Sequence, residues 1–204
     1  METPPRQTDD VDSPGVTPDT NFPGSCKGRL LVATPPLDDP NFDHTVVYVL
    51  EHHDDGAVGV VLNRPIGEPL PEQLDRWEPY LSPPQELFSG GPVELDAMIA
   101  LARLDGPTEG AWSPVVGDLG SVDLAHDPLV VADRVVRLRV FQGYSGWGPL
   151  QLDAELAEGA WMVLPAEPAD IFTLRPADLW RAVLRRQGGR LAWVANAPDD
   201  LSSN

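Results

Sequence analysis

The segment from Val140 to Trp161, VFQGYSGWGPLQLDAELAEGAW, carries Gly143, Gly146 and Gly148 between a predicted strand and a predicted helix. Glycine-rich turns of this kind hold phosphate groups in dinucleotide-binding proteins and in P-loop proteins. The dinucleotide fingerprint requires G-x-G-x-x-G, and the P-loop requires a lysine followed by serine or threonine. This segment has neither pattern, and Pro149 lacks one of the helix N-terminal N–H groups that an anion would use. We therefore interpret the segment as a tight structural corner.

The same segment contains Gly143-Tyr144-Ser145-Gly146-Trp147, which is close to the nucleophile motif G-x-S-x-G. In that motif the second glycine is small so that the helix can approach, and the histidine follows the serine in the chain. Here Trp147 occupies the glycine position, and all four histidines precede Ser145. We expect Ser145→Ala to be silent, Gly146 to adopt a positive φ and Trp147 to pack beneath the corner. No catalytic residue is assigned.

The stretch Glu51-His52-His53-Asp54-Asp55 concentrates residue types that bind metals. On a strand, Glu51 and His53 point to one face and His52 to the other, so only a turn could bring them together. We interpret the stretch as a polar hairpin tip. No metal or cofactor is assigned.

Five arginines flank or lie on the last predicted helix, whose apolar stripe is Leu179, Trp180, Val183 and Leu184. They are Arg175, Arg181, Arg185, Arg186 and Arg190. Their positions fit a solvated helix face. The alternative is a docking site for an anionic partner.

Charge and cysteine content exclude several function classes. The 204 residues carry a formal net charge of -18, which disfavours nucleic acid as the main ligand. The single cysteine, Cys26, cannot form an internal disulfide, and its surroundings do not suggest an activated thiol. The N-terminus has no apolar signal region, and no apolar run is long enough to span a membrane. We expect a cytoplasmic protein that does not associate with a membrane.

Composition divides the chain into three parts. Residues 1–25 are acidic and proline-rich with almost no large apolar side chain, which predicts a disordered tail. Residues 26–198 form one predicted domain, and residues 199–204 a short C-terminal tail.

Hydrophobic patterning predicts the elements of that domain. The apolar strands at 45–52 and 57–62 are apolar on both faces, which is typical of interior strands, and Asp54-Asp55-Gly56 predicts a hairpin between them. The alternation of Arg137 and Arg139 with Val136, Leu138 and Val140 predicts a strand with one wet face. The remaining predicted strands are 29–33, 98–104, 135–141 and 161–164, and the predicted helices are 71–77, 127–132, 149–158 and 176–187. For 98–104 the alternative is a helix, because Val93, Ala97, Ala100 and Leu101 have helical spacing.

A hairpin followed by helices interleaved with strands indicates an α/β fold of the α+β type. We expect a single domain in which a mixed, largely antiparallel sheet is flanked by helices in a layered sandwich.

Several linked motifs resemble the bacterial YqgE/AlgH family. They are LLVATPPLDDPNFDHTVVYVLEH, GAVGVVLNRP, FSGGPV, GYSGWGPLQLDAEL followed by AW, and ADLWRAVL. They span Leu30 to about Leu184 in the order of that family. The resemblance implies one mixed α/β domain, a cytosolic setting and an unresolved function. This chain departs from the family pattern at Ser145, where alanine is common, at Leu150, where glycine is common, and at Ala102, where histidine is frequent.

The family motifs supply the candidate binding residues. These are Asn63, Arg64, Gly90, Gly91, Tyr144, Trp147, Gln151 and Glu155. The leading hypothesis is a non-enzymatic binding or regulatory protein with a protein or small-molecule partner. The alternative is an enzyme in which Arg64 holds an anion and Glu155 acts as acid or base, which requires one pocket joining Arg64, Gly91, Tyr144 and Gln151. A transcriptional regulator is a second alternative, implied by a label within the family, but we expect no direct DNA binding.

Overall fold

A 13-residue strand, β8 (Val135–Trp147), connects the two halves of one curled sheet. The structure is a computed structural model that describes residues 24–34, 40–106 and 110–195. The predicted tails therefore lie almost wholly outside the described residues. The strand order is β6-β7-β5-β8-β3-β2-β1-β9, and β4 pairs with β8. Only the β4–β8 pairing is parallel among the pairs of named strands in these ranges, so the predicted mixed, largely antiparallel sheet is confirmed.

The other strands have the following bounds: β1 Arg29–Ala33, β2 Val46–His53, β3 Gly56–Val61, β4 Phe88–Ser89, β5 Val93–Leu104, β6 Trp112–Val116, β7 Leu119–Val122 and β9 Trp161–Pro165. The α-helices are α1 Gln151–Ala157, α2 Pro168–Ile171, α3 Leu179–Gln187 and α4 Gly189–Val194. Short 3-10 helices occupy Glu72–Tyr80, Pro128–Val130, Ala132–Arg134 and Pro176–Asp178. No helix within the described ranges is long and apolar enough to cross a membrane.

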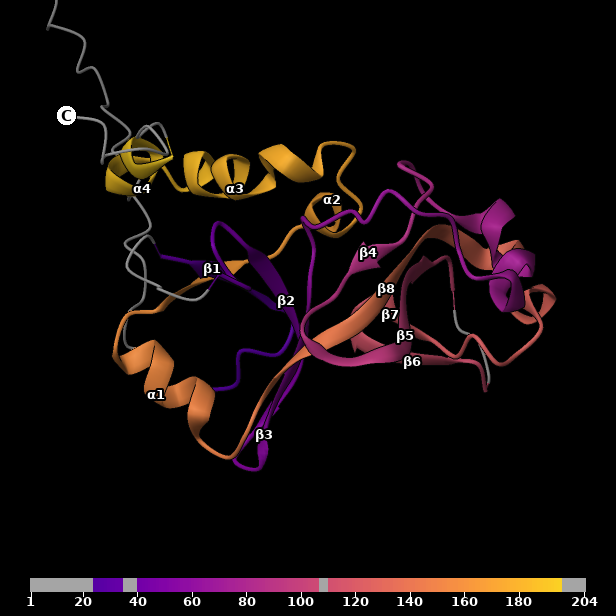
Figure 1. Cartoon of the computed structure of the whole chain (residues 1–204), viewed down its shortest axis with the longest axis horizontal. Coiled ribbons are helices and arrows are strands. Elements are labelled where there is room, and N and C mark those ends of the chain that lie inside the picture. The colour runs from indigo at the N-terminus through magenta and orange to yellow at the C-terminus, as the bar shows by residue number, and fades with distance from the viewer. Residues whose placement is uncertain (1–23, 35–39, 107–109, 196–204) are drawn as a thin grey trace, which may run out of the picture.

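Helices cover both faces of the β1–β2 half of the sheet, with α1 on one side and α2, α3 and α4 on the other (Figure 1). Successive residues of a strand point to opposite faces. Leu30 and Val32 of β1 therefore pack in the cluster that contains the apolar stripe of α3, whereas Leu31 packs in the cluster that contains Leu152 of α1. The two-sided apolarity of these strands is thus explained by a helical layer on each face.

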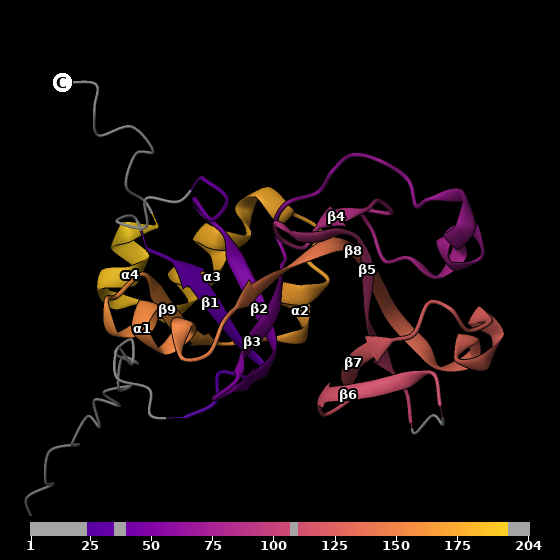
Figure 2. The ribbon, with the colours of Figure 1, turned by 60° about the horizontal axis from the view of Figure 1, so that its bottom comes forward.

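The second half of the sheet lies on the far side of β8 (Figure 2). A second apolar cluster lies here, between the sheet and the 3-10 helix Glu72–Tyr80. The sheet contributes Ala100 and Ala102 from β5 and Leu138 from β8, and the helix contributes Trp77 and its C-cap residue, Leu81. Residues 71–77 were expected to form a short helix, and a 3-10 helix begins there. Strands β6 and β7 were not predicted, because polar residues and glycines weaken their apolar pattern.

The glycine-rich segment is not a corner, and this corrects the prediction. Strand β8 continues through it to Trp147, and the turn follows at residues 148–150, where Leu150 has a φ of 57°. The residue with a positive φ is Gly143, at 67°, rather than Gly146. Trp147 does pack beneath the turn, with 6% of its surface exposed.

Strand β8 needs glycine at position 143 because the Gly90–Gly91 segment crosses it at backbone contact, and a Cβ on Gly143 would lie 2.7 Å from the Gly91 carbonyl oxygen. A Cβ on Gly91 would overlap the backbone of Tyr144 and Ser145. Ser145 itself is fully buried, and its Oγ donates a hydrogen bond to the Gly90 carbonyl, 3.1 Å away. Ser145→Ala is therefore expected to cost about 1 kcal/mol of stability, in place of the silent change expected from the sequence.

We expect Gly91→Ala to destabilise the fold by about 3 kcal/mol or more, because the new methyl group meets backbone atoms and the φ of Gly91 is 149°. The control is Gly67→Ala, at a φ of 78° with no atom within 4 Å of the added Cβ. We expect that variant to lose only about 1 kcal/mol of stability, from the strain of placing alanine at a positive φ. Urea denaturation measures both, and equal losses would contradict the close crossing of β8.

Cys26 provides a pH-dependent test of the core. Burial raises the pKa of the Cys26 thiol to about 11, and the Asp153 carboxylate adds to the effect. The unfolded thiol releases its proton near its ordinary pKa of about 8.5, so the folded state binds more protons above that pH. We expect the free energy of unfolding to fall between about pH 9 and 11, and less so in Cys26→Ala. A thiol reagent that modified the native protein as fast as free cysteine would contradict this burial.

Candidate functional site

Asn63 and Arg64 hold the chain that leads into β2. The Asn63 side chain accepts a hydrogen bond from the Val46 N–H and donates one to the His44 carbonyl, both at 2.9 Å. The Arg64 guanidinium donates to the Asp43 carbonyl at 2.7 Å. The polar groups of Asn63 are therefore committed to backbone atoms.

Trp147, Gln151 and Glu155 form a second network, between the end of β8 and α1. One carboxylate oxygen of Glu155, Oε2, accepts hydrogen bonds from the indole N–H groups of Trp147 and Trp161, each at 2.8 Å. Gln151 donates to the other oxygen, Oε1, and accepts from the Gly148 N–H. Both carboxylate oxygens of Glu155 thus accept hydrogen bonds within the fold, and Oε2 fixes two buried tryptophans.

Tyr144 points away from both networks. It pairs with Val93 in the sheet and lies beside Glu94, and partial burial and a hydrogen bond to Glu94 raise its pKa. The alternation of side chains along β8 separates Tyr144 from Trp147.

A cavity of about 470 Å³ brings together Arg64 and Gly91 with Asn41 and Ser89. Tyr144 and Gln151 are not among its lining residues. The enzyme hypothesis requires Arg64, Gly91, Tyr144 and Gln151 in one pocket, and this cavity is lined by only two of them.

The histidines at the β2–β3 hairpin point to opposite faces, as predicted. His52 is buried, and its Nδ1 accepts a hydrogen bond from the Cys26 N–H, whereas His53 is exposed and lies 3.2 Å from Glu51. Across the described ranges, no three histidine, cysteine or acidic side chains come together as metal ligands.

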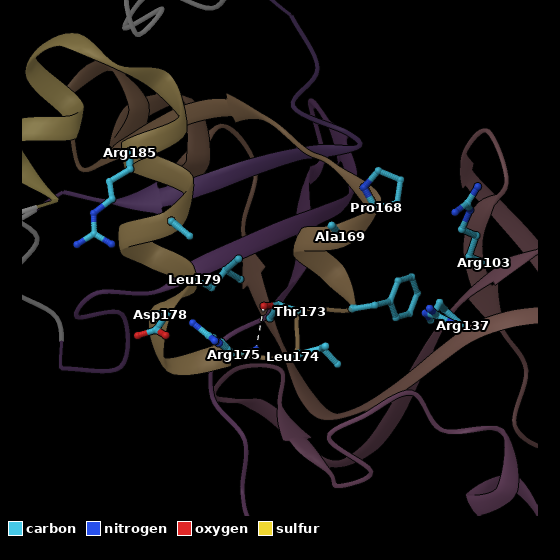
Figure 3. Close-up of a pocket in the computed structure, with 12 residues that line it drawn as sticks. Arg103, Arg137, Pro168, Ala169, Thr173, Leu174, Arg175, Asp178, Leu179 and Arg185 are labelled. Atoms are coloured by element: carbon cyan, nitrogen blue, oxygen red, sulfur yellow. Dashed lines mark hydrogen bonds between the residues drawn. The ribbon is translucent and has the colours of Figure 1, made fainter.

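A larger cavity, of about 740 Å³, lies between the β5–β8 ladder and the α2–α3 segment. We call it the arginine groove. It is lined by Arg103, Arg137, Pro168, Ala169, Phe172, Thr173, Leu174, Arg175, Asp178, Leu179, Ala182 and Arg185. In Figure 3, Arg103 and Arg137 lie on the strand side of the groove, and Arg175, Asp178 and Arg185 on the helix side. Four arginines and one aspartate give this lining a formal charge of +3 in a chain of net charge -18.

Arg103 and Arg137 are direct neighbours across the ladder. They are paired in register between β5 and β8. Arg103 donates through Nε to Asp118, and Arg137 donates to the carbonyl of the adjacent Val136. Of the four groove arginines, the sequence analysis named Arg137, Arg175 and Arg185 but did not bring them together, because the pairing of β5 with β8 is not readable from either strand alone.

Arg139 is fully buried behind the groove, which corrects the prediction of a wet face at this position. Its guanidinium donates to the carbonyls of Pro83, Ile171 and Thr173, each at 2.9 Å, and lies 4.2 Å from the centre of the Phe88 ring. Burial lowers the pKa of Arg139 to about 10, so the group remains charged at neutral pH. Arg139 thereby holds the 171–173 backbone, which forms one wall of the groove.

Of the C-terminal arginines, Arg186 is used within the fold. It bridges Asp170 and Glu167, at 2.9 Å and 3.2 Å, and the hydrogen bond to Asp170 raises its pKa. Arg185 is exposed and lines the groove.

We expect Glu155→Ala to cost about 3 kcal/mol of stability, because both indole N–H groups lose their acceptor. Glu155→Gln keeps one oxygen and should cost less. The control is Glu158→Ala, at an exposed position at the end of α1. Urea denaturation followed by tryptophan fluorescence measures all three, and wild-type stability in Glu155→Ala would contradict the structural role of this carboxylate.

Comparison with known proteins places these features in a family. The AlgH-like family matches residues 30–192. The UPF0301 protein of Streptomyces coelicolor is 48% identical over 185 residues, which cover 88% of this chain and 96% of that protein. The UPF0301 protein of Mycobacterium tuberculosis is 42% identical over 181 residues, which cover 87% and 90%.

Two solved structures are similar. A crystal structure of a protein from Corynebacterium diphtheriae has a TM-score of 0.78 at 28% identity and covers 83% of this chain and 91% of that one. The solution structure of the AlgH protein from Pseudomonas aeruginosa has a TM-score of 0.66 at 32% identity and covers 88% and 97%. The names of these relatives state no specific function. The chain belongs to the AlgH-like family.

Proposed function

We propose that this protein is a cytoplasmic, non-enzymatic binding protein whose ligand is a small anion held in the arginine groove. The observation that supports this most directly is the register pair Arg103–Arg137. Like charges directly opposite each other on one face of a sheet are destabilising. Asp118 forms an ion pair with Arg103, whereas Arg137 has no carboxylate partner in the described part of the chain. An anionic ligand would relieve the repulsion that remains between Arg103 and Arg137.

The groove has the size and lining of a ligand site. Pockets for small molecules commonly measure about 300–1,000 Å³ and combine apolar walls with a few polar groups. Here Leu179 and Leu174 provide apolar walls between the arginines of the two sides (Figure 3).

The enzyme alternative is less favoured because its proposed acid or base, Glu155, is engaged by two indoles. Direct DNA binding is also disfavoured. A duplex requires an extended basic surface, whereas the basic lining of the groove is local and includes Asp178.

Thermal unfolding in the presence of succinate, citrate, phosphate or pyrophosphate, at constant ionic strength, tests the proposal. At least one anion should raise the unfolding temperature of the wild type more than that of Arg137→Gln, because a ligand that binds only the native state stabilises it. Salts also stabilise buried apolar surface in general. This general effect is the same in both proteins, so it cancels when their unfolding temperatures are compared.

Without added anion, Arg137→Gln should be as stable as the wild type or slightly more stable, because it removes the repulsion from Arg103. Arg190→Gln is the matched control, since it removes the same charge from an exposed position outside the groove lining. The proposal fails if no anion distinguishes the wild type from Arg137→Gln.

A further inference from the structure

We propose that the ligand of the arginine groove is a phosphate monoester of a small apolar molecule. In this arrangement the phosphate sits between Arg103 and Arg137, and the apolar part lies along Phe172, Leu174 and Leu179. The inference rests on the proposed anion-binding function and specifies the ligand of the same site.

The charge and donor count of the Arg103–Arg137 pair favour phosphate over carboxylate. A guanidinium has five N–H donors, and a carboxylate with two oxygens is already matched by the fork of one arginine. A phosphate monoester carries a charge of about -1.5 to -2 at pH 7 and has three terminal oxygens, so it can engage two arginines at once. Arg103 uses its Nε for Asp118, and a guanidinium retains four further N–H groups beyond that one.

Arg139 strengthens the positive field at this end of the groove. It lies two residues along β8 from Arg137, on the same face of the strand, and its three hydrogen bonds go to backbone carbonyls. These carbonyls carry no formal negative charge, and the Glu86 carboxylate acts on the guanidinium electrostatically without a hydrogen bond to it. A buried cation in a low-dielectric wall attracts an anion more strongly than an exposed cation does.

The apolar part of the ligand is indicated by the wall between the two charged ends. Leu174 is 71% exposed although it borders a cavity, and Leu179 lines the same groove from α3 (Figure 3). An exposed leucine at the mouth of a charged groove gains stability when an apolar group covers it.

The far end of the groove disfavours a second phosphate. Asp178 lines it together with Arg175 and Arg185, so positive charge does not extend uniformly along the groove. A monoester with an uncharged body suits this distribution better than a polyphosphate does.

Isothermal titration with phenyl phosphate, inorganic phosphate and benzoate, at pH 7.5 and constant ionic strength, tests the inference. Phenyl phosphate should bind most tightly, since it alone offers both the dianion and the apolar ring. Arg137→Gln should weaken phenyl phosphate binding by about tenfold or more, which corresponds to about 1.4 kcal/mol. Arg190→Gln should leave it unchanged.

A second variant separates the two parts of the site. Leu174→Ser should weaken phenyl phosphate several-fold and leave inorganic phosphate unaffected, whereas Leu129→Ser, at an exposed position outside the groove lining, should change neither. Lowering the pH from 7.5 to 5.5 should also weaken phenyl phosphate, because the second phosphate pKa is about 6 and the dianion becomes a monoanion.

The outcomes distinguish the inference from the proposed function. If benzoate or succinate binds in an Arg137-dependent way at least as tightly as phenyl phosphate, the groove binds anions but the phosphate assignment is wrong. If no anion binds in an Arg137-dependent way, both fail. Phenyl phosphate binding that Leu174→Ser leaves unchanged would overturn the assignment of the apolar part.

Discussion

The close passage of the Gly90–Gly91 segment across β8 is the contact on which the rest of the structure depends. The Gly90 N–H donates to the Gln142 carbonyl, and the Gly90 carbonyl accepts from the Val61 N–H and from the Ser145 hydroxyl. These bonds join β3, β8 and the loop before β5 at one point. Since β8 pairs with β5 along its first part and with β3 at its end, this crossing fixes how the two halves of the sheet meet.

The two ends of β8 consequently serve different purposes. At its end, Trp147 is buried against Trp161 and fixed by Glu155, which anchors α1 and completes one face of the core. At its start, Arg137 and Arg139 project from the face that is opposite Leu138 and its apolar cluster. One strand thus provides a packed anchor at one end and a row of positive charge at the other.

Positive charge is concentrated in one groove of this protein, although the chain as a whole carries a net negative charge. The chain as a whole is strongly acidic, which disfavours binding to polyanions, yet the arginine groove concentrates cations from two strands and two helical segments. Arg139 secures this arrangement, since it ties the wall of the groove to β8 through the carbonyls of Ile171 and Thr173. Under the proposed function, a local site of this kind suits a small anion better than an extended polyanion.

The family motifs acquire a physical meaning from these contacts. Asn63, Gly91 and Glu155 each make a hydrogen bond or a close backbone approach within the fold, which gives these motif positions a structural role. Leu150 stands where the family pattern commonly has glycine, and its φ of 57° explains why glycine suits that position.

The sequence by itself determined the interior strands, the hairpin at Asp54-Asp55-Gly56 and the end of α3 at Gln187, because local hydrophobic period and turn chemistry specify them. It also determined that His52 and His53 diverge, since strand geometry alone separates them. Tertiary structure decided that Arg139 is buried, that β8 runs through its glycines instead of turning, and that Arg103 lies opposite Arg137. These features depend on which strands pair and in which register. Register is set by packing across the whole sheet, and no local pattern in either strand carries that information.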